Sequence, residues 1–209
     1  MEPRIAVCIT TTPNRKQLFE QSFKHLRENT PNDVSYKIYL DEKYEGIAKA
    51  KNKCLAMCDG FDFVFLLDDD IFALDKSWTD EYINSGLEHA MYIFDRRLLI
   101  KSEQYFSYDL PRGCMLFLTR KAIDTAGGMD EDFKVWGYEH AEYSRRIFNM
   151  GLTPAPFIDI PNVIDLFYSY DKWQACKSSV SDSQRMQSIP ANYHLYQQKY
   201  YSKEFKPFR

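Results

Sequence analysis

A run of apolar residues that ends in three aspartates constrains this chain more than any other stretch. Residues 61–67 (FDFVFLL) are almost entirely apolar, and Asp68, Asp69 and Asp70 follow directly. Such a run, rich in Phe and Val, predicts a strand buried on both faces in the centre of an α/β sheet. Three adjacent carboxylates repel one another, and a hard divalent cation with oxygen ligands would remove that repulsion. The simpler alternative is an acidic turn that closes a core strand.

Two further strand patterns precede this run, and both also end in polar residues. Residues 4–11 and 34–40 have strand character, and helical segments separate the three strands. Strand, helix, strand, helix, strand with short connections predicts a parallel sheet with right-handed crossovers. Because the carboxyl ends of parallel strands meet at one edge, Thr10–Thr12 and Asp41 should lie beside the aspartates. This convergence is typical of a nucleotide site.

The helix predicted over about residues 46–58 carries a lysine on its apolar stripe. Lys51 lies among Ala50, Cys54 and Leu55 on a helical wheel. A lysine in this position must either extend to solvent or find an anion. Near the strand ends, that anion is either a phosphate or one of the aspartates.

The rest of the chain shows weaker patterns. Residues 75–90 favour a surface helix. Residues 91–100 and 102–108 favour strands or an irregular hairpin, and 114–118 a short buried strand. A brief helix should follow Thr119, a longer one should run over about 138–150, and a late strand over 157–160. On the longer helix, Glu142 and Arg146 have the spacing of an ion pair. Residues 178–188 read as a loop.

Composition excludes some function classes. The chain has 209 residues with a net charge of −3, so no strongly basic field points to nucleic acid. Its five cysteines include no zinc-type Cys-x-x-Cys pair and favour a reducing compartment. The sequence shows neither a signal-peptide pattern nor a membrane-span run, so we expect a cytoplasmic protein.

Four blocks, in order and spacing, resemble the GT-A-fold glycosyltransferases, in particular the large family 2 group that uses nucleotide-diphosphate sugars. They are Thr12–Arg15 (TPNR), Gly46–Asn52 (GIAKAKN), Phe65–Ile71 (FLLDDDI) and Arg112–Ile147, within a resemblance that covers about residues 5–165. It implies an α/β, Rossmann-like GT-A fold, with a central mostly parallel sheet flanked by helices. We expect one domain over 1–209, with a nucleotide and metal half at about 1–75. An acceptor half would follow at about 76–165, and residues 166–209 would cover the site.

The resemblance also implies roles for single residues. Asp68 and Asp70 match the Asp-x-Asp motif, so Asp70, with Asp68, would bind Mn²⁺ or Mg²⁺ across the two donor phosphates. Lys51 stands where the group usually has Arg and would keep a charge for phosphate. The residues expected around the donor are Thr10, Thr11, Asp41, Glu42, Asp69, Gly128, Asp130 and Trp136, the last as a platform for a sugar ring or as a core residue.

The resemblance departs from its pattern at Glu139–His140. Inverting members usually have Glu-Asp here, with the Asp as general base. His140 could take the acceptor proton near neutral pH, Glu139 could do so instead, or a retaining reaction would need no base. For a further metal ligand from the late part of the chain, Asp165 is the first candidate and His194 the second.

These features predict a metal-dependent glycosyltransferase that moves a sugar from a nucleotide-diphosphate sugar to a hydroxyl acceptor. We expect the donor to be UDP-linked. A glycan, a lipid-linked glycan or a protein is the favoured acceptor. Modified DNA bases fit the net charge less well. The rival hypotheses are a nucleotidyltransferase and a catalytically inactive module that binds nucleotide sugars or glycans.

Overall fold

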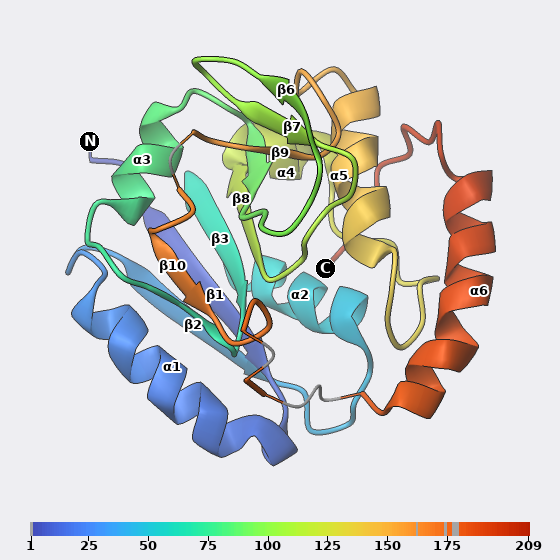
Figure 1. The fold of residues 1–209 in the computed structure, drawn as a ribbon, viewed down its shortest axis with the longest axis horizontal. Coiled ribbons are helices and arrows are strands. Elements are labelled where there is room, and N and C mark those ends of the chain that lie inside the picture. Colours follow the sequence, from blue (N-terminus) through green and yellow to red (C-terminus); the bar gives the residue numbers. More distant parts are fainter. Residues whose placement is uncertain (1, 162, 174, 177–179) are drawn as a thin grey trace.

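A five-stranded sheet forms the centre of the molecule (Figure 1). The structure is a computed structural model that describes residues 2–161, 163–173, 175–176 and 180–209. The strand order is β2 (Ser35–Leu40), β1 (Ile5–Thr11), β3 (Phe63–Asp68), β8 (Met115–Thr119) and β5 (His89–Met91). Strand β1 runs parallel to β2 and β3, whereas β8 is antiparallel to β3 and β5. The predicted α/β fold with a mostly parallel sheet is confirmed.

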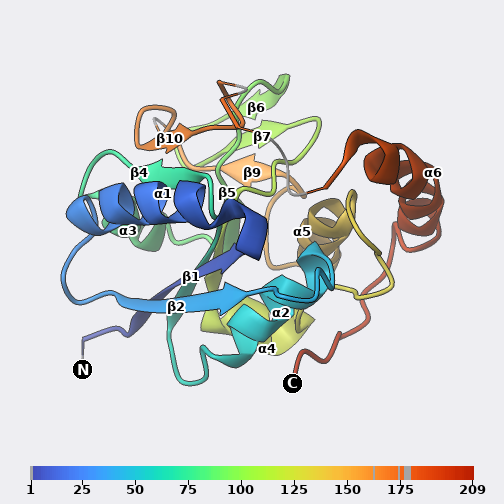
Figure 2. The same ribbon diagram turned by 90° about the horizontal axis from the view of Figure 1, so that it is seen from below.

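Helices cover both faces of this sheet, as the strand sequences require. In β1, Ile5, Val7 and Ile9 belong to one apolar cluster and the alternate residues Ala6 and Cys8 to the other. The first cluster packs against α1 (Lys16–Glu28) and α3 (Trp78–Asn84), and the second against α2 (Ile47–Ala56), α4 (Arg120–Ala126) and α5 (Glu139–Asn149). Figure 2 shows α1 on one side of the sheet and α2 with α4 on the other.

Two small antiparallel sheets extend the fold beyond the carboxyl end of β3. Strand β4 (Ile71–Ala73) pairs with β10 (Phe167–Ser169), and β6 (Leu98–Lys101), β7 (Phe106–Tyr108) and β9 (Ile158–Asp159) pair with one another. A short 3-10 turn, η1 (Pro13–Arg15), links β1 to α1. Because β10 pairs with β4, the chain that follows β10 lies beside the three aspartates.

Several sequence-based boundaries were wrong. The helix predicted over 75–90 is the shorter α3, since Gly86 adopts a φ of +71° and the chain then enters β5. The strand predicted over 91–100 is divided between β5 and β6. The predicted loop at 178–188 becomes helix α6 (Asp182–Gln198) from Asp182 onward, and Ser178 and Ser179 lie outside the described residues.

Helix α6 begins with a capping box in which Ser181 and Gln184 satisfy each other's backbone N–H groups. It contains Pro190, and only Asn192 and Tyr196 of its residues are buried. With no continuous apolar stripe, the sequence offered little helical periodicity. Among the described residues, no helix combines the length and apolar character that a membrane crossing requires.

Candidate active site

A cavity of about 390 Å³ opens at the carboxyl ends of β1, β2 and β3. It contains seven of the residues predicted from the sequence, namely Thr10, Thr11, Asp41, Asp68, Asp69, Asp70 and Trp136. The residues it adds include Arg15, Tyr44, Val135, Asp171, Gln184 and Arg185. The ends of the three predicted strands therefore meet at one cavity. This argues against the alternative that the three aspartates only form an acidic turn after β3.

Asp69 is held by two neighbours from the β1–α1 connection. The Thr11 hydroxyl donates to Asp69 Oδ2 at 2.6 Å, and Arg15 Nε donates to Asp69 Oδ1 at 2.7 Å. Burial raises the pKa of Asp69, and the hydrogen bonds from Arg15 and Thr11 oppose that rise. Arg15 belongs to the TPNR block, but no sequence pattern predicts that it lies against the aspartates.

Asp68 is paired with the lysine on the apolar stripe of α2. Lys51 is completely buried, and its Nζ lies 2.7 Å from Asp68 Oδ1. Of the two anions considered for Lys51, the structure selects the aspartate. Lys51 is not among the cavity-lining residues, so it acts on the site by holding Asp68 and not by touching a ligand.

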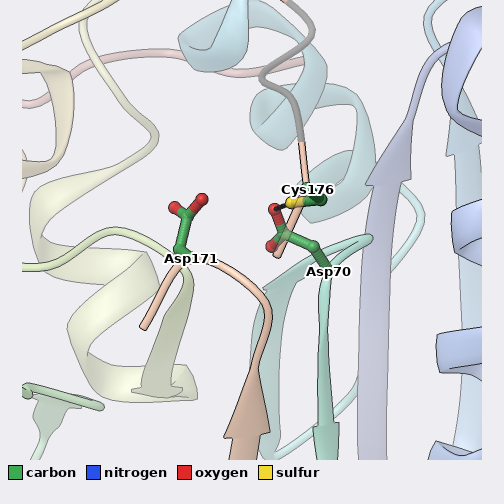
Figure 3. Close-up of side chains that lie close together, drawn as sticks. All are labelled: Asp70, Asp171 and Cys176. Atoms are coloured by element: carbon green, nitrogen blue, oxygen red, sulfur yellow. Dashed lines mark hydrogen bonds between the residues drawn. The ribbon is translucent and has the colours of Figure 1, made fainter. Parts of the chain in front are cut away.

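Asp70 is buried like Asp69 and has two neighbours from the chain after β10. A carboxylate oxygen of Asp70, a carboxylate oxygen of Asp171 and the sulfur of Cys176 all lie within 4.8 Å of one another (Figure 3). Arg15 Nη2 donates to Asp70 Oδ2 at 2.6 Å. Burial raises the pKa of Asp70 to about 7, and the nearby carboxylates of Asp68 and Asp171 contribute to the rise. Three candidate ligands thus surround one point that a cation would fit.

Neither late-chain metal ligand predicted from the sequence lies at this point. Asp165 is exposed in the turn before β10 and is not among the residues that line the cavity. His194 is exposed on α6, where its Nε2 lies 2.9 Å from Gln198 Nε2. The pairing of β10 with β4 brings Asp171 to the cavity instead. That pairing joins residues about a hundred positions apart, and local sequence carries no signal for it.

The far wall of the cavity combines a strained loop with the first turn of α6. Val135 has a φ of +60°, a conformation that is costly for a β-branched residue and often marks a functional site. Asn192 Nδ2 and Ser188 Oγ donate to the Trp136 carbonyl at 3.0 and 2.9 Å. The Arg185 guanidinium lies 4.6 Å from the Trp136 ring centroid. Helix α6 therefore fixes this loop in place.

Comparison with known proteins agrees with this arrangement. A family model described as the N-terminal domain of galactosyltransferase matches residues 97–187. A protein of Acanthamoeba polyphaga mimivirus, named an uncharacterized glycosyltransferase, is 29% identical over 142 residues, which are 61% of this chain. The chain spans about half the length of this relative, 55%.

Solved structures share the architecture at low identity. GalNAc-T7 with UDP, GalNAc and Mn²⁺ superposes with a TM-score of 0.60 at 12% identity over 76% of this chain and 42% of that chain. S. aureus TarS in complex with UDP superposes with a TM-score of 0.54 at 10% identity over 92% of this chain and 71% of that chain. The chain has the GT-A fold, and its sequence is similar to glycosyltransferases. The predicted resemblance is confirmed.

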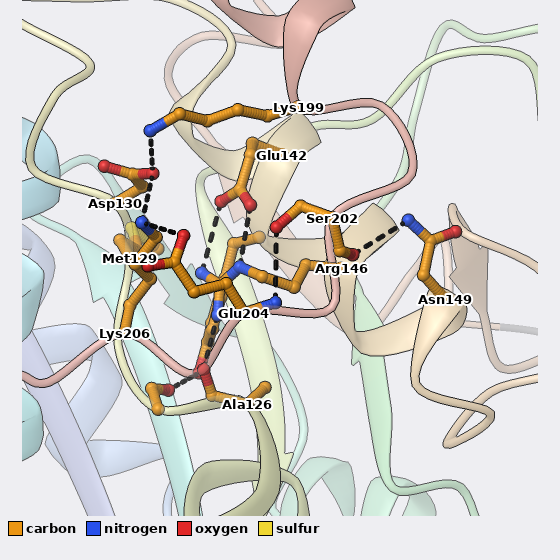
Figure 4. A network of polar contacts seen from close by, with 12 residues as sticks. Ala126, Met129, Asp130, Glu142, Arg146, Asn149, Lys199, Ser202, Glu204 and Lys206 are labelled. Atoms are coloured by element: carbon orange, nitrogen blue, oxygen red, sulfur yellow. Dashed lines mark hydrogen bonds and ion pairs between the residues drawn. The ribbon is translucent and has the colours of Figure 1, made fainter.

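Two residues expected at the donor lie elsewhere in this GT-A domain. A Cβ on Gly128 would stand 2.4 Å from Asn52 Oδ1, so this glycine packs against α2 and not against a ligand. Asp130 forms ion pairs with Lys199 and Lys206 (Figure 4). Neither residue lines the cavity, and both instead anchor the end of the chain. The prediction that they approach the donor sugar finds no support in this geometry.

The candidate bases of the GT-A domain also lie outside the cavity lining. Glu139 Oε1 lies 3.3 Å from His140 Nδ1 in the first turn of α5, and both side chains are largely buried. A Cβ on Gly113 would overlap the His140 ring, so this close approach requires glycine. Glu42, predicted beside the nucleotide, is exposed and is likewise absent from the lining.

Proposed function

We propose that this chain is a metal-dependent glycosyltransferase that moves a sugar from a nucleotide-diphosphate sugar to a hydroxyl acceptor. The observation that carries the proposal is the cavity at the strand ends, where four carboxylates face two guanidinium groups. The carboxylates belong to Asp68, Asp69, Asp70 and Asp171, and the guanidinium groups to Arg15 and Arg185. Such a cavity suits a diphosphate only when a cation offsets the carboxylates.

Asp70, with Asp68, would hold that cation, proposed as Mn²⁺ or Mg²⁺. When bound, the ion would neutralise the charge that develops on the departing diphosphate. The buried oxygen Asp70 Oδ1 has no hydrogen-bond partner among the described residues, so the donor set fits a metal. Lys51 would keep Asp68 oriented, because their 2.7 Å ion pair fixes one carboxylate oxygen.

The remaining lining residues suit the other parts of the donor. Thr10, Thr11 and Asp41 at the ends of β1 and β2 offer hydroxyl and carboxylate groups to a ribose and base. Trp136 offers an apolar face to a sugar ring. Because the GalNAc-T7 and TarS structures are described with UDP, we propose a UDP-linked donor.

For the acceptor we propose a glycan, a lipid-linked glycan or a protein hydroxyl. The acceptor proton is not assigned to Glu139 or His140, since neither side chain lines the cavity. The proposal therefore allows either inversion or retention at the anomeric carbon. The anomeric configuration of the product distinguishes these two outcomes.

The proposal is tested by thermal unfolding with a panel of nucleotide sugars, with and without Mn²⁺. A ligand at one hundred times its dissociation constant stabilises the folded state by about 2.7 kcal/mol, which for a domain of this size raises Tm by roughly 5–10 °C. The shift should require both donor and Mn²⁺ and should be lost in Asp70→Asn. Asp165→Asn, an exposed carboxylate outside the cavity, is the matched control and should keep it.

Turnover separates the proposal from its rivals. Release of the nucleoside diphosphate with Mn²⁺, even as slow donor hydrolysis, supports sugar transfer. Binding without any turnover across the donor panel would favour the inactive module, and release of pyrophosphate would favour the nucleotidyltransferase. Survival of the Mn²⁺-dependent shift in Asp70→Asn would show that the metal assignment is wrong.

A further inference from the structure

We propose that Cys176 supplies a sulfur ligand to the cation of this cavity, alongside carboxylate oxygens of Asp70 and Asp171. The inference rests on the proposed metal dependence and adds to it a ligand set and a metal preference. It concerns residues that the sequence did not single out, because the β4–β10 pairing brings Asp171 to the cavity and Cys176 against Asp70.

The three side chains have the separations of ligands around one ion. Ligand atoms bound to a common metal at about 2.0–2.3 Å lie no more than about 4.6 Å apart. The candidate atoms of Asp70, Asp171 and Cys176 lie within 4.8 Å of one another, so small side-chain rotations suffice. The Cys176 sulfur is 3.6 Å from Asp70 Oδ2. A tetrahedral site with a sulfur and an oxygen ligand places these atoms ~3.6 Å apart.

A second observation points to a missing partner at the same place. Asp70 is only 5% exposed, and its Oδ1 has no hydrogen-bond partner among the described residues. Burying a carboxylate oxygen without a donor is costly, so native proteins rarely leave one in this state. Arg15 Nη2 donates to Oδ2 at 2.6 Å, so the oxygen without a partner is the other one of this carboxylate. Figure 3 shows the Asp70 carboxylate beside the thiol, with Asp171 facing it from the chain after β10.

The ligand set determines which ions should bind well. Mg²⁺ and Ca²⁺ prefer oxygen ligands throughout, whereas a thiolate favours Zn²⁺, Co²⁺ and Cd²⁺. In the metal-free protein the thiol points its proton toward Asp70 Oδ2. Binding through sulfur must therefore release one proton from Cys176 to the buffer as the metal–sulfur bond forms. The other four cysteines are free and buried, and none belongs to this cluster.

The test uses Co²⁺ and Cd²⁺ with the full chain, since both report a bound thiolate by a charge-transfer band in the ultraviolet. The wild-type protein should show this band, and Cys176→Ser should abolish it. Cys176→Ser should also weaken Cd²⁺ at least tenfold while changing Mg²⁺ affinity less than threefold. Calorimetry in two buffers of different ionisation enthalpy should find one fewer proton released by Cys176→Ser. Asp171→Asn should weaken both ions, and the control Asp165→Asn neither.

Three outcomes would overturn the inference: no band in the wild type, a band that persists in Cys176→Ser, or equal loss of Cd²⁺ and Mg²⁺ affinity. Cys176→Ala, with circular dichroism on each variant, separates ligand loss from misfolding. None of these measurements uses turnover. An intact band without sugar transfer would refute the proposed function alone, whereas transfer with a spectrum independent of Cys176 would refute the ligand set alone.

Discussion

The buried ion pair between Glu142 and Arg146 on α5 gives the sharpest prediction for stability. Arg146 Nε donates to Glu142 Oε1 at 2.7 Å and Nη2 donates to Oε2 at 3.2 Å. The same guanidinium donates to the carbonyl oxygens of Ala126 and Gly128, so it joins α5 to the turn after α4 (Figure 4). Both charged side chains are about 1% exposed.

Arg146→Met should lower the free energy of unfolding by about 4–7 kcal/mol. Breaking a buried pair by removing one partner costs about 3–5 kcal/mol, because the remaining charge is left unpaired. The two carbonyl oxygens also lose their donor, which adds roughly 0.5–1 kcal/mol each. In the double variant Glu142→Leu with Arg146→Met, no buried charge remains. The double variant should be only about 1–3 kcal/mol less stable than the wild type. Adding Glu142→Leu to Arg146→Met should therefore recover part of the stability that Arg146→Met loses.

Urea unfolding followed by circular dichroism, with a check that slopes agree among variants, measures these differences. Lys16 and Glu20 form a matched control, since they have the same spacing but are 77% and 60% exposed. Lys16→Met should therefore cost no more than about 0.5 kcal/mol. A double variant less stable than Arg146→Met alone would refute the reasoning, as would a cost below about 1 kcal/mol for Arg146→Met.

Three further predictions follow from other buried contacts. Gly128→Ala should cost about 1–3 kcal/mol in thermal or urea unfolding, because the new Cβ would stand 2.4 Å from Asn52 Oδ1; an unchanged midpoint would contradict the packing. Lys51→Met should lower the free energy of unfolding by about 1–3 kcal/mol, because Asp68 is left unpaired; this is less than for a fully buried pair, since Asp68 is 31% exposed. The variant should also bind the donor more weakly. Calorimetry that finds neither loss of stability nor weaker binding would count against the ion pair. Burial raises the pKa of Asp159 to about 8, whereas its ordinary value in the unfolded chain is near 4. Between these pH values the unfolded state gives up its proton while the folded state keeps it, so the stability that this proton contributes declines as pH rises from about 4 to 8. The stability difference between wild type and Asp159→Asn should narrow over that range by up to ~1.4 kcal/mol per pH unit, whereas a constant difference would refute it.

The sequence predicted the central strands because their apolar runs are consequences of burial itself. A strand covered on both faces must be apolar along its whole length, and β1 and β3 show this directly. The same logic predicted which end of each strand carries polar residues. Thr119 also caps α4 as expected, accepting a hydrogen bond from the Ala122 N–H at 3.1 Å. These features depend on residues close together in sequence.

Gly128 and Asp130, predicted at the donor from the sequence resemblance, have other neighbours in the structure, because one type of side chain can serve two purposes. Asp130 looks equally suitable for binding a sugar hydroxyl and for pairing with a lysine. Only the return of the chain after α6, which brings Lys199 and Lys206 against it, decides in favour of the ion pair. Gly128 allows close approach to any neighbour, and the neighbour here is Asn52.

The sequence alone determined that the carboxyl ends of the central strands carry polar residues, with the aspartates at the end of β3. Each strand and its polar end are read from residues that are neighbours in the sequence. Tertiary structure decided what surrounds Asp70. Arg15, Asp171 and Cys176 come from segments up to about a hundred positions away, joined to the site by a turn and by the β4–β10 pairing. Their identities follow no local period. Long-range strand pairing, and not local propensity, therefore determined which side chains surround Asp70.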